Sequence, residues 1–262
     1  MDLSLSGRNA LVCGSSAGIG LACARELALL GANITLMARN KEALRTALAS
    51  LDASRSQRHA LLVADLSDPA KVRQISSSAV AHTSAFHILV NNTGGPPTGP
   101  LLGATADQFR AALDSLLLSA HELVQALVPG MKQARYGRII NITSTSVKQP
   151  IPGLGLSNTI RAAVANWAKT LSQELGPHGI TVNNVLPGYT STERLSSLLR
   201  GRATTQGTTE QDVARELQAT IPAGRFGTPE EIAAAVAFLA TPAAAYINGI
   251  NLPVDGGRLG SL

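Results

Sequence analysis

The chain has 262 residues, of which 45% are hydrophobic, so it can bury one large core, and we expect a single domain spanning residues 1–262. Its 22 Lys and Arg and 17 Asp and Glu give a formal charge of +5, but the basic residues are scattered and only 3% of residues are aromatic. Nucleic-acid binding needs clustered positive charge and rings that stack on bases, so we expect no nucleic-acid partner.

The cysteines and the first residues indicate the compartment. Only Cys13 and Cys23 occur, both in apolar runs, so we expect buried free thiols, no disulfide framework and no metal site. The start, MDLSLSGRNALV, lacks the basic and apolar regions of a signal peptide, and no apolar run approaches the roughly 18 residues that span a bilayer. The sequence therefore predicts a cytoplasmic protein without a membrane partner.

Short β-branched or leucine-rich runs alternate with longer alanine- and leucine-rich segments along the chain. The runs that predict strands are, in order, NALVCG, ITLMA, HALLVA, FHILVNN, GRIINIT, ITVNNV and INLPV. The segments with helical periodicity lie near 18–30, 41–50, 69–82, 107–134, 155–176 and 229–240. This alternation predicts an α/β fold of the Rossmann type, with a doubly wound parallel sheet. The insertion 190–225 is the least patterned region, and long insertions of this kind are often lids.

The first expected strand ends in a glycine-rich stretch, LVCGSSAGIG. Gly14, Gly18 and Gly20 lie where this strand meets the first helix, with Ser16 and Ile19 between them. Missing side chains let the backbone approach a pyrophosphate, whose charge the helix N-terminus faces. A tight strand-to-helix turn would also use glycine, but the position between the first strand and the first helix is typical of a dinucleotide site.

The end of the second strand, LMARNKE, indicates which dinucleotide is bound. An acidic side chain here would accept hydrogen bonds from the adenosine ribose and repel a 2′-phosphate. This chain has Arg39 instead, with Asn40 beside it, which predicts NADP(H) in preference to NAD(H). The alternative is a solvated loop cation, because Ala17 adds no second positive charge to the glycine-rich loop.

The third expected strand ends at Asp65, in the stretch VADLSD. We expect Asp65 and the following Leu66 to meet the adenine of the dinucleotide. A plain helix N-cap is the alternative, and it suits Asp68 better than Asp65.

Together with these residues, later motifs make the chain resemble short-chain dehydrogenases/reductases over essentially its whole length, in particular bacterial 3-oxoacyl-acyl-carrier-protein reductases. The motifs are CGSSAGIG, NNTGG at 91–95, NITS at 141–144, NNVLPGYTST at 183–192, IPAGRFGTPEEIAAAVAFLA at 221–240 and INGINLPVDGG at 248–257. The resemblance implies a small carbonyl or alcohol substrate, acyl thioesters included. It also implies a homotetramer or homodimer, with interfaces on the helices near 107–134 and 155–176 and on the C-terminal segment.

The resemblance also implies cofactor contacts after the fourth and sixth strands. Asn91 and Gly94 match positions that line the cofactor beside the fourth strand. Pro187, Gly188 and Thr192 match the segment that holds the nicotinamide amide and orients the ring. Turn and loop residues without a ligand are the alternative at both places.

The catalytic positions depart from the family pattern. There a serine polarises the substrate carbonyl, a tyrosine thirteen residues later donates the proton, and a lysine four residues further lowers the pKa of that tyrosine and holds the ribose. Spacing from Ser144 reaches Ser157 and then Arg161, and the family's relay asparagine aligns with Leu116. Arg161 can still direct positive charge and donors at the ribose hydroxyls. Proton supply suffers, because guanidinium and aliphatic hydroxyl groups have pKa values far above neutrality.

Three other side chains are candidates for proton work, each with a plainer alternative. Tyr189 lies in the expected nicotinamide segment and could donate a proton, and the alternative is a packing role. Lys148 lies four residues after Ser144, and the alternative for it is an exposed loop charge. His121 is expected to pack on its helix.

Two hypotheses remain. The first is an NADP(H)-dependent oxidoreductase with Ser144, Ser157 and Arg161 at its centre and a non-standard proton path. The second is a nucleotide-binding pseudoenzyme with a structural or regulatory role. Steady NADPH oxidation with a carbonyl substrate separates them.

Overall fold

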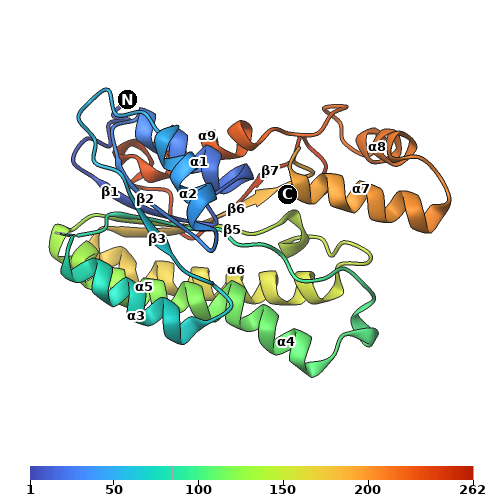
Figure 1. The fold of residues 1–262 in the computed structure, drawn as a ribbon, viewed down its shortest axis with the longest axis horizontal. Helices are drawn as coiled ribbons and strands as arrows, with labels where there is room; N and C mark the ends of the chain where they lie inside the picture. Colours follow the sequence, from blue (N-terminus) through green and yellow to red (C-terminus); the bar gives the residue numbers. More distant parts are fainter. Residues whose placement is uncertain (84, 262) are drawn as a thin grey trace.

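The chain folds into one parallel sheet with helices on both faces (Figure 1). The structure is a computed structural model and describes residues 1–83 and 85–261. Seven strands lie in the order β3-β2-β1-β4-β5-β6-β7. They are β1 Asn9–Cys13, β2 Asn33–Ala38, β3 Ala60–Val63, β4 Ile88–Asn91, β5 Gly137–Ile142, β6 Ile180–Pro187 and β7 Asn251–Val254. The predicted Rossmann-type doubly wound sheet is confirmed.

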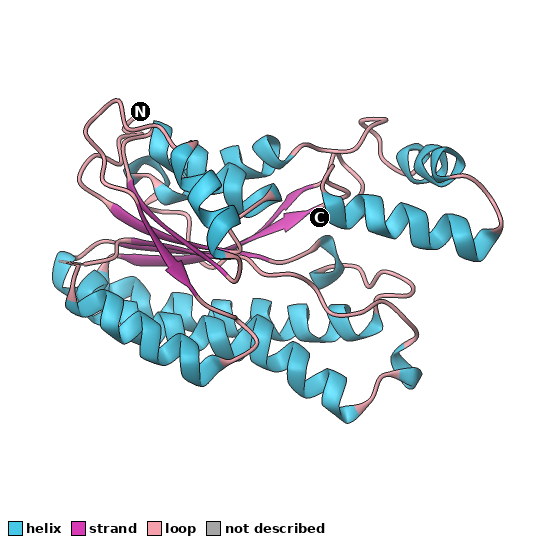
Figure 2. Cartoon of the chain, viewed as in Figure 1, coloured by secondary structure: helices cyan, strands magenta, loops and turns pink. Residues whose placement is uncertain are grey.

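The helices form two layers, one on each face of the sheet (Figure 2). One layer holds α1 Gly18–Leu29, α2 Lys41–Ala49 and α9 Pro229–Ala240. The other holds α3 Pro69–Ala81, α4 Ala106–Leu113, α5 Ser119–Ala134 and α6 Gly155–Leu175. Each helix predicted from the periodicity is present, with ends within two residues of the expected ones.

The segment 190–225 contains two helices that the sequence analysis did not predict. They are α7 Glu193–Gln206 and α8 Glu210–Ala219, and they extend beyond the carboxyl ends of β6 and β7 (Figure 1). Each buries only two hydrophobic side chains, Leu195 and Ala203 in α7 and Val213 and Leu217 in α8. The segment is rich in Gly, Thr and Arg, which obscures the short apolar pattern of α8, where Val213 and Leu217 lie four residues apart.

A continuous helical stretch, Ala106–Ala134, is long and apolar enough by composition to cross a membrane. Its apolar residues do not form one uninterrupted run, because Asp114, His121 and Glu122 lie among them. Half of its apolar window is buried inside the fold, where it packs against α3 and α6. A core helix has this composition because neighbouring helices cover much of its surface.

A ladder of asparagine side chains crosses the sheet. Asn91 Nδ2 donates to Asn141 Oδ1 at 2.8 Å, Asn141 Nδ2 donates to Asn184 Oδ1 at 2.9 Å, and Asn184 Nδ2 donates to Asn251 Oδ1 at 2.8 Å. Asn141 and Asn184 are almost completely buried. Because buried amides need partners, the ladder favours one register of β4, β5, β6 and β7.

Replacing the central amide should destabilise the protein. Asn184→Leu would leave the Asn141 amide and the Asn251 carbonyl oxygen without these partners, at a cost of about 1–3 kcal/mol in unfolding free energy. Asn166→Leu, on an exposed face of α6, is the control, with an expected change within about 0.5 kcal/mol. Urea unfolding followed by circular dichroism measures both, and equal stabilities of the two variants would contradict the ladder's role.

Candidate active site

The predicted site residues gather at the carboxyl ends of the strands, near the point where the strand order reverses. The reversal lies between β1 and β4. A cleft opens there because the loops leaving these two strands turn to opposite faces of the sheet. Three cavities lie along this edge, and Thr93, two residues after β4, lines all of them. They therefore adjoin one another in one cleft.

The outer cavity, with about 900 Å³ of empty space, lies beside β1, β2 and β3. Predicted cofactor residues from four strand ends line it, namely Gly14, Ser16, Arg39, Asn40, Asp65, Leu66 and Gly94. The fold thus brings together residues that the sequence analysis selected from separate motifs.

The glycine-rich turn fits tightly against the end of β4. A Cβ on Gly14 would lie 2.6 Å from the carbonyl oxygen of Asn92, and one on Gly20 would lie 2.2 Å from that of Gly14. The Asn92 amide donates to the carbonyl oxygens of Cys13 and Gly14 at 3.3 and 3.2 Å. Glycine is required at both positions because a side chain would displace backbone.

Two polar residues of the outer cavity also have local partners. The Asp65 carboxylate accepts hydrogen bonds from the backbone N–H and hydroxyl of Ser67 at 2.9 and 2.8 Å. These bonds and the nearby charge of Arg39 hold the pKa of Asp65 below its usual value. Asn40 caps α2, and Asp68 caps α3, as the alternative for that aspartate proposed.

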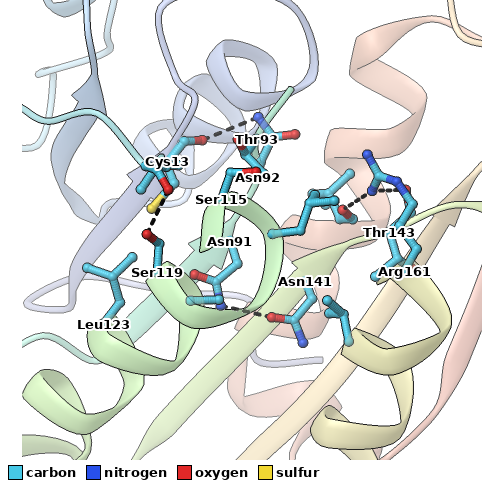
Figure 3. A pocket seen from close by; sticks show the side chains of 15 residues that line it. Cys13, Asn91, Asn92, Thr93, Ser115, Ser119, Leu123, Asn141, Thr143 and Arg161 are labelled. Atoms are coloured by element: carbon cyan, nitrogen blue, oxygen red, sulfur yellow. Dashed lines mark hydrogen bonds between the residues drawn. The ribbon is translucent and has the colours of Figure 1, made fainter. Parts of the chain in front are cut away.

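The inner cavity, with about 390 Å³ of empty space, lies between the sheet and the start of α5 (Figure 3). Asn91 lines it, with its amide bonded to Asn141, and Arg161 enters from the other side. Leu116 also lines this cavity. The position of the family's relay asparagine is therefore beside Arg161 but carries an apolar side chain.

The backbone at Leu116 is unusual. Residues Asp114–Leu118 form a π-helical turn, η2, between α4 and α5. Such turns occur mostly inside α-helices and frequently at functional sites. Leu116 packs with Leu156 and Ile160 of α6. The chain thus combines a π-turn at this position with a leucine side chain, which cannot form a hydrogen bond to a water molecule.

The serine cavity, which we name for Ser144 and Ser157, has about 890 Å³ of empty space and opens beside α7. Predicted residues on its wall are Ile19, Ser144, Ser157, Arg161, Pro187, Gly188 and Thr192. Gly18 does not line the cavity, but it lies next to Thr192, which does. A Cβ on Gly18 would lie 3.5 Å from Thr192 Cγ2. Every predicted site residue therefore lies in or next to the cleft.

Arg161 is anchored by three hydrogen bonds. Its Nη1 donates to the carbonyl oxygens of Ile142 and Thr143 at 3.1 and 2.8 Å, and its Nε donates to Ser157 Oγ at 3.2 Å. Ser157 is only 4% exposed and Arg161 only 8%. Ser144 Oγ accepts from the backbone N–H of Ser146 at 3.1 Å, so its hydroxyl hydrogen can point to a ligand.

The charge of Arg161 is fixed near neutral pH. Burial, and to a smaller extent the positive charge of Arg194, lower the pKa of Arg161 to about 10. The guanidinium therefore remains protonated at pH 7. It can stabilise negative charge but cannot exchange protons usefully.

Sequence reasoning missed Asn92, Thr93, Arg194 and Arg258. Arg194 Nη1 reaches from α7 across the cleft and donates to the carbonyl oxygen of Gly95 at 3.2 Å. Arg258 comes from the C-terminal segment and lines the serine cavity. Both arginines lie in or beside quoted motifs, but scattered basic residues do not reveal which ones converge.

The three side chains considered as alternative proton donors mostly have packing roles in the structure. Tyr189 lines the serine cavity and packs edge-on against Phe226, with ring centroids 6.1 Å apart. His121 accepts a hydrogen bond from Trp167 Nε1 at 3.3 Å, as the packing alternative proposed. Lys148 ends the short 3-10 turn Thr145–Val147 and is not on the wall of the serine cavity.

Both cysteines should be inert in the folded protein. Cys13 and Cys23 are buried, and burial raises the pKa of each thiol to about 12. Since the thiolate is the reactive form, neither should react with an aromatic disulfide reagent at pH 8. Both should react once guanidinium chloride unfolds the chain. Rapid labelling of either thiol in the native protein would contradict this prediction.

The fold and the cleft define a class of protein, an α/β protein whose cleft lies at the strand reversal where dinucleotides bind in doubly wound sheets. Residues 14–258 match the family described as Enoyl-(Acyl carrier protein) reductase. The chain belongs to the short-chain dehydrogenase/reductase family.

Similar proteins cover almost the whole chain. The 3-oxoacyl-(acyl-carrier-protein) reductase FabG of Vibrio cholerae serotype O1 is 33% identical over 97% of this chain and 98% of its own. The crystal structure of L-sorbose reductase from Gluconobacter frateurii, complexed with NADPH and L-sorbose, is 32% identical, with a TM-score of 0.93 over 100% of both chains. A variant of actinorhodin polyketide ketoreductase with NADPH is 28% identical, with a TM-score of 0.90 over 97% of this chain and 98% of that one.

Proposed function

We propose that this protein is an NADP(H)-dependent oxidoreductase that interconverts a small carbonyl compound and its alcohol by a proton path without the family's tyrosine and lysine. One observation carries the proposal. The outer cavity, with its glycine-rich turn and Arg39, adjoins the serine cavity, with its two hydroxyls. Relatives with NADPH in their structures support the choice of cofactor.

The residues present fit a dinucleotide. Gly14 at the start of the turn and Gly20 in the first turn of α1 have no side chains, and Ala17 at the helix N-cap makes no side-chain hydrogen bond. The first N–H groups of α1 are therefore available to a pyrophosphate. Arg39 would hold the 2′-phosphate, and Asp65 would accept a hydrogen bond from the adenine.

At the nicotinamide end, Pro187, Gly188 and Thr192 would hold the amide, and Asn91, Gly94 and Arg161 would line the ribose side. When bound, the cofactor supplies a hydride to the carbonyl carbon, so the oxygen must receive a proton. Hydroxyl groups from this chain can orient that oxygen.

Within this proposal Ser144 donates a hydrogen bond to the substrate oxygen. Ser157 accepts a hydrogen bond from Arg161 and directs its own hydroxyl hydrogen into the cavity. The fixed charge of Arg161 stabilises negative charge that develops on the oxygen. None of these groups is an efficient acid at pH 7, so the proton comes from the solvent and reaches the substrate oxygen through water in the serine cavity, which regains a proton from bulk solvent.

The test is turnover with the full-length protein. NADPH binding, followed by its fluorescence, and steady NADPH oxidation with a panel of ketones, aldehydes and 3-oxoacyl thioesters are both expected. NADPH binding without oxidation would favour the nucleotide-binding pseudoenzyme. Absence of NADPH binding would contradict both hypotheses.

The remaining assignments are proposals that follow from the family. We propose a homotetramer or homodimer in the cytoplasm, acting on a small carbonyl or alcohol substrate, with acyl thioesters among the candidates. The similar FabG protein is named a 3-oxoacyl-acyl-carrier-protein reductase, which supports acyl thioesters as candidate substrates. Sedimentation measures the assembly.

A further inference from the structure

The serine cavity has a strongly one-sided charge. Three arginines, Arg161, Arg194 and Arg258, line it, and no Asp, Glu or Lys does so among the described residues. None of the three forms an ion pair with a carboxylate of residues 1–83 or 85–261. A cleft lined by one sign of charge focuses its field on ligands of the opposite sign.

Two of these arginines are already engaged with the protein. Arg161 binds two carbonyl oxygens and Ser157, and Arg194 binds the carbonyl oxygen of Gly95. Burial lowers the pKa of both, and the positive charge of Arg194 lowers the pKa of Arg161 further. An anion in the cavity would offset both effects.

Arg258 is different, because its Nε is buried and has no hydrogen-bond partner among the described residues. Its guanidinium carbon lies 4.7 Å from the centroid of the Tyr189 ring, which orients the plane of the group. A buried donor without a partner costs about 1–3 kcal/mol in general, so such a group in a native structure needs an explanation, and a bound ion is one.

The local fold holds Arg258 in place. Asp255 Oδ1 accepts from the backbone N–H of Gly257 at 3.0 Å, and Oδ2 accepts from that of Leu259 at 2.8 Å. The turn packs on Gly188, where a Cβ would lie 2.8 Å from the Asp255 Cα. Asp255 is thus committed to the turn backbone, and the structure gives it no salt bridge to Arg258.

The cofactor phosphates do not account for Arg258. Gly14, Ser16 and Arg39, at the expected positions of the cofactor phosphates, line the outer cavity, whereas Arg258 lines the serine cavity with Ser144 and Ser157. An anion bound by Arg258 would therefore belong to the molecule that is reduced or oxidised.

We propose that the substrate carries a carboxylate, a keto acid or hydroxy acid whose carboxylate is bound by Arg258 while its carbonyl or hydroxyl group faces Ser144 and Ser157. The guanidinium of an arginine is a planar fork of N–H donors that matches the two oxygens of a carboxylate. This inference rests on the proposed function and narrows its substrate class.

The experiment compares charged and neutral forms of the same ketones. Calorimetry with the full-length protein, with and without NADPH, measures binding of pyruvate, 2-oxobutanoate, 4-oxopentanoate and phenylglyoxylate and of their methyl esters. At least one acid should bind about tenfold or more tightly than its ester, as expected for a charge-assisted bidentate contact. If every ester binds as well as its acid, or no acid binds, the proposal is overturned.

Variants assign the preference to one side chain. Arg258→Gln should abolish the preference for the acid and change NADPH affinity less than about twofold, and Arg258→Lys should keep part of the preference. The control is Arg215→Gln, an exposed arginine of α8 outside the cavity, which should change neither affinity. Circular dichroism checks that each variant is folded, and Arg258→Lys provides the test if Arg258→Gln does not fold.

Other outcomes also decide. An unchanged acid preference in Arg258→Gln, or a loss of NADPH affinity without a loss of acid affinity, would overturn the assignment of Arg258 to a substrate carboxylate. Tighter binding of dihydroxyacetone phosphate than of every keto acid would overturn the carboxylate. Failure of NADPH to bind the parent protein would contradict the proposed function, while the comparison of acid with ester without NADPH would still test the anion site.

Discussion

The double variant Ser157→Tyr with Arg161→Lys should reduce a reactive ketone or 3-oxoacyl thioester about 10²–10⁴-fold faster than the parent, the usual effect of a positioned general acid. Ser157 lines the serine cavity, so we expect a phenol at 157 to extend into its empty space. Lysine at 161 can still donate to the carbonyl oxygens of Ile142 and Thr143 and can lower the pKa of the phenol. NADPH consumption in the presence of substrate measures the rate.

A matched control isolates the phenol hydroxyl. Ser157→Phe with Arg161→Lys places the same ring at 157 without an acidic group, so it should remain at the parent rate. Each single change should also give less than the pair, because catalytic groups that act together are not additive. Leu116→Asn as a third change should raise the rate further, since it restores a polar side chain beside position 161 in the inner cavity.

A folded triple variant that binds NADPH but does not turn over would reject the idea that only the proton path differs. It would indicate a pocket that excludes these carbonyl compounds, or a protein whose nucleotide serves as a ligand. The keto acids that are compared with their methyl esters should be tested in the same assay, because a cavity lined by three arginines favours negatively charged substrates.

Arg39→Asp should reverse the cofactor preference. In the parent, NADPH should bind about 10- to 150-fold more tightly than NADH, corresponding to about 1.5–3 kcal/mol for a hydrogen bond to a charged group. Aspartate at 39 would repel the 2′-phosphate and accept hydrogen bonds from the ribose hydroxyls of NADH. Titration of protein fluorescence with each dinucleotide measures the four dissociation constants.

The control makes the same charge change elsewhere. Arg58→Asp alters an exposed arginine just before β3, at the opposite end of that strand from the outer cavity, and should leave both affinities unchanged. Equal affinities of NADPH and NADH in the parent would reject Arg39 as the selector of the 2′-phosphate. A similar loss of NADPH affinity in Arg58→Asp and in Arg39→Asp would indicate a general effect of the charge change.

Much of the fold could be predicted from sequence because its elements are strongly patterned. The strands are short continuous apolar runs, and the helices of the two layers carry apolar residues at helical spacing, so both patterns can be seen in the chain. The residues proposed to hold the cofactor could be selected for the same reason. Gly14, Arg39 and Asp65 each end a predicted strand, and parallel strands place their carboxyl ends at one edge of the sheet.

What only the tertiary structure decided depends on contacts between distant segments. Helices α7 and α8 escaped prediction because the segment 190–225 is rich in Gly, Thr and Arg, and few apolar residues interrupt this composition. The sequence identified Arg161 by spacing, but its anchoring to the carbonyl oxygens of β5 depends on how α6 packs against the sheet. Arg194 and Arg258 are 64 residues apart in the sequence. They line one cavity because α7 and the C-terminal segment both reach it in the folded chain. Charge density in a cavity is a property of convergence in space, which composition and local spacing do not contain.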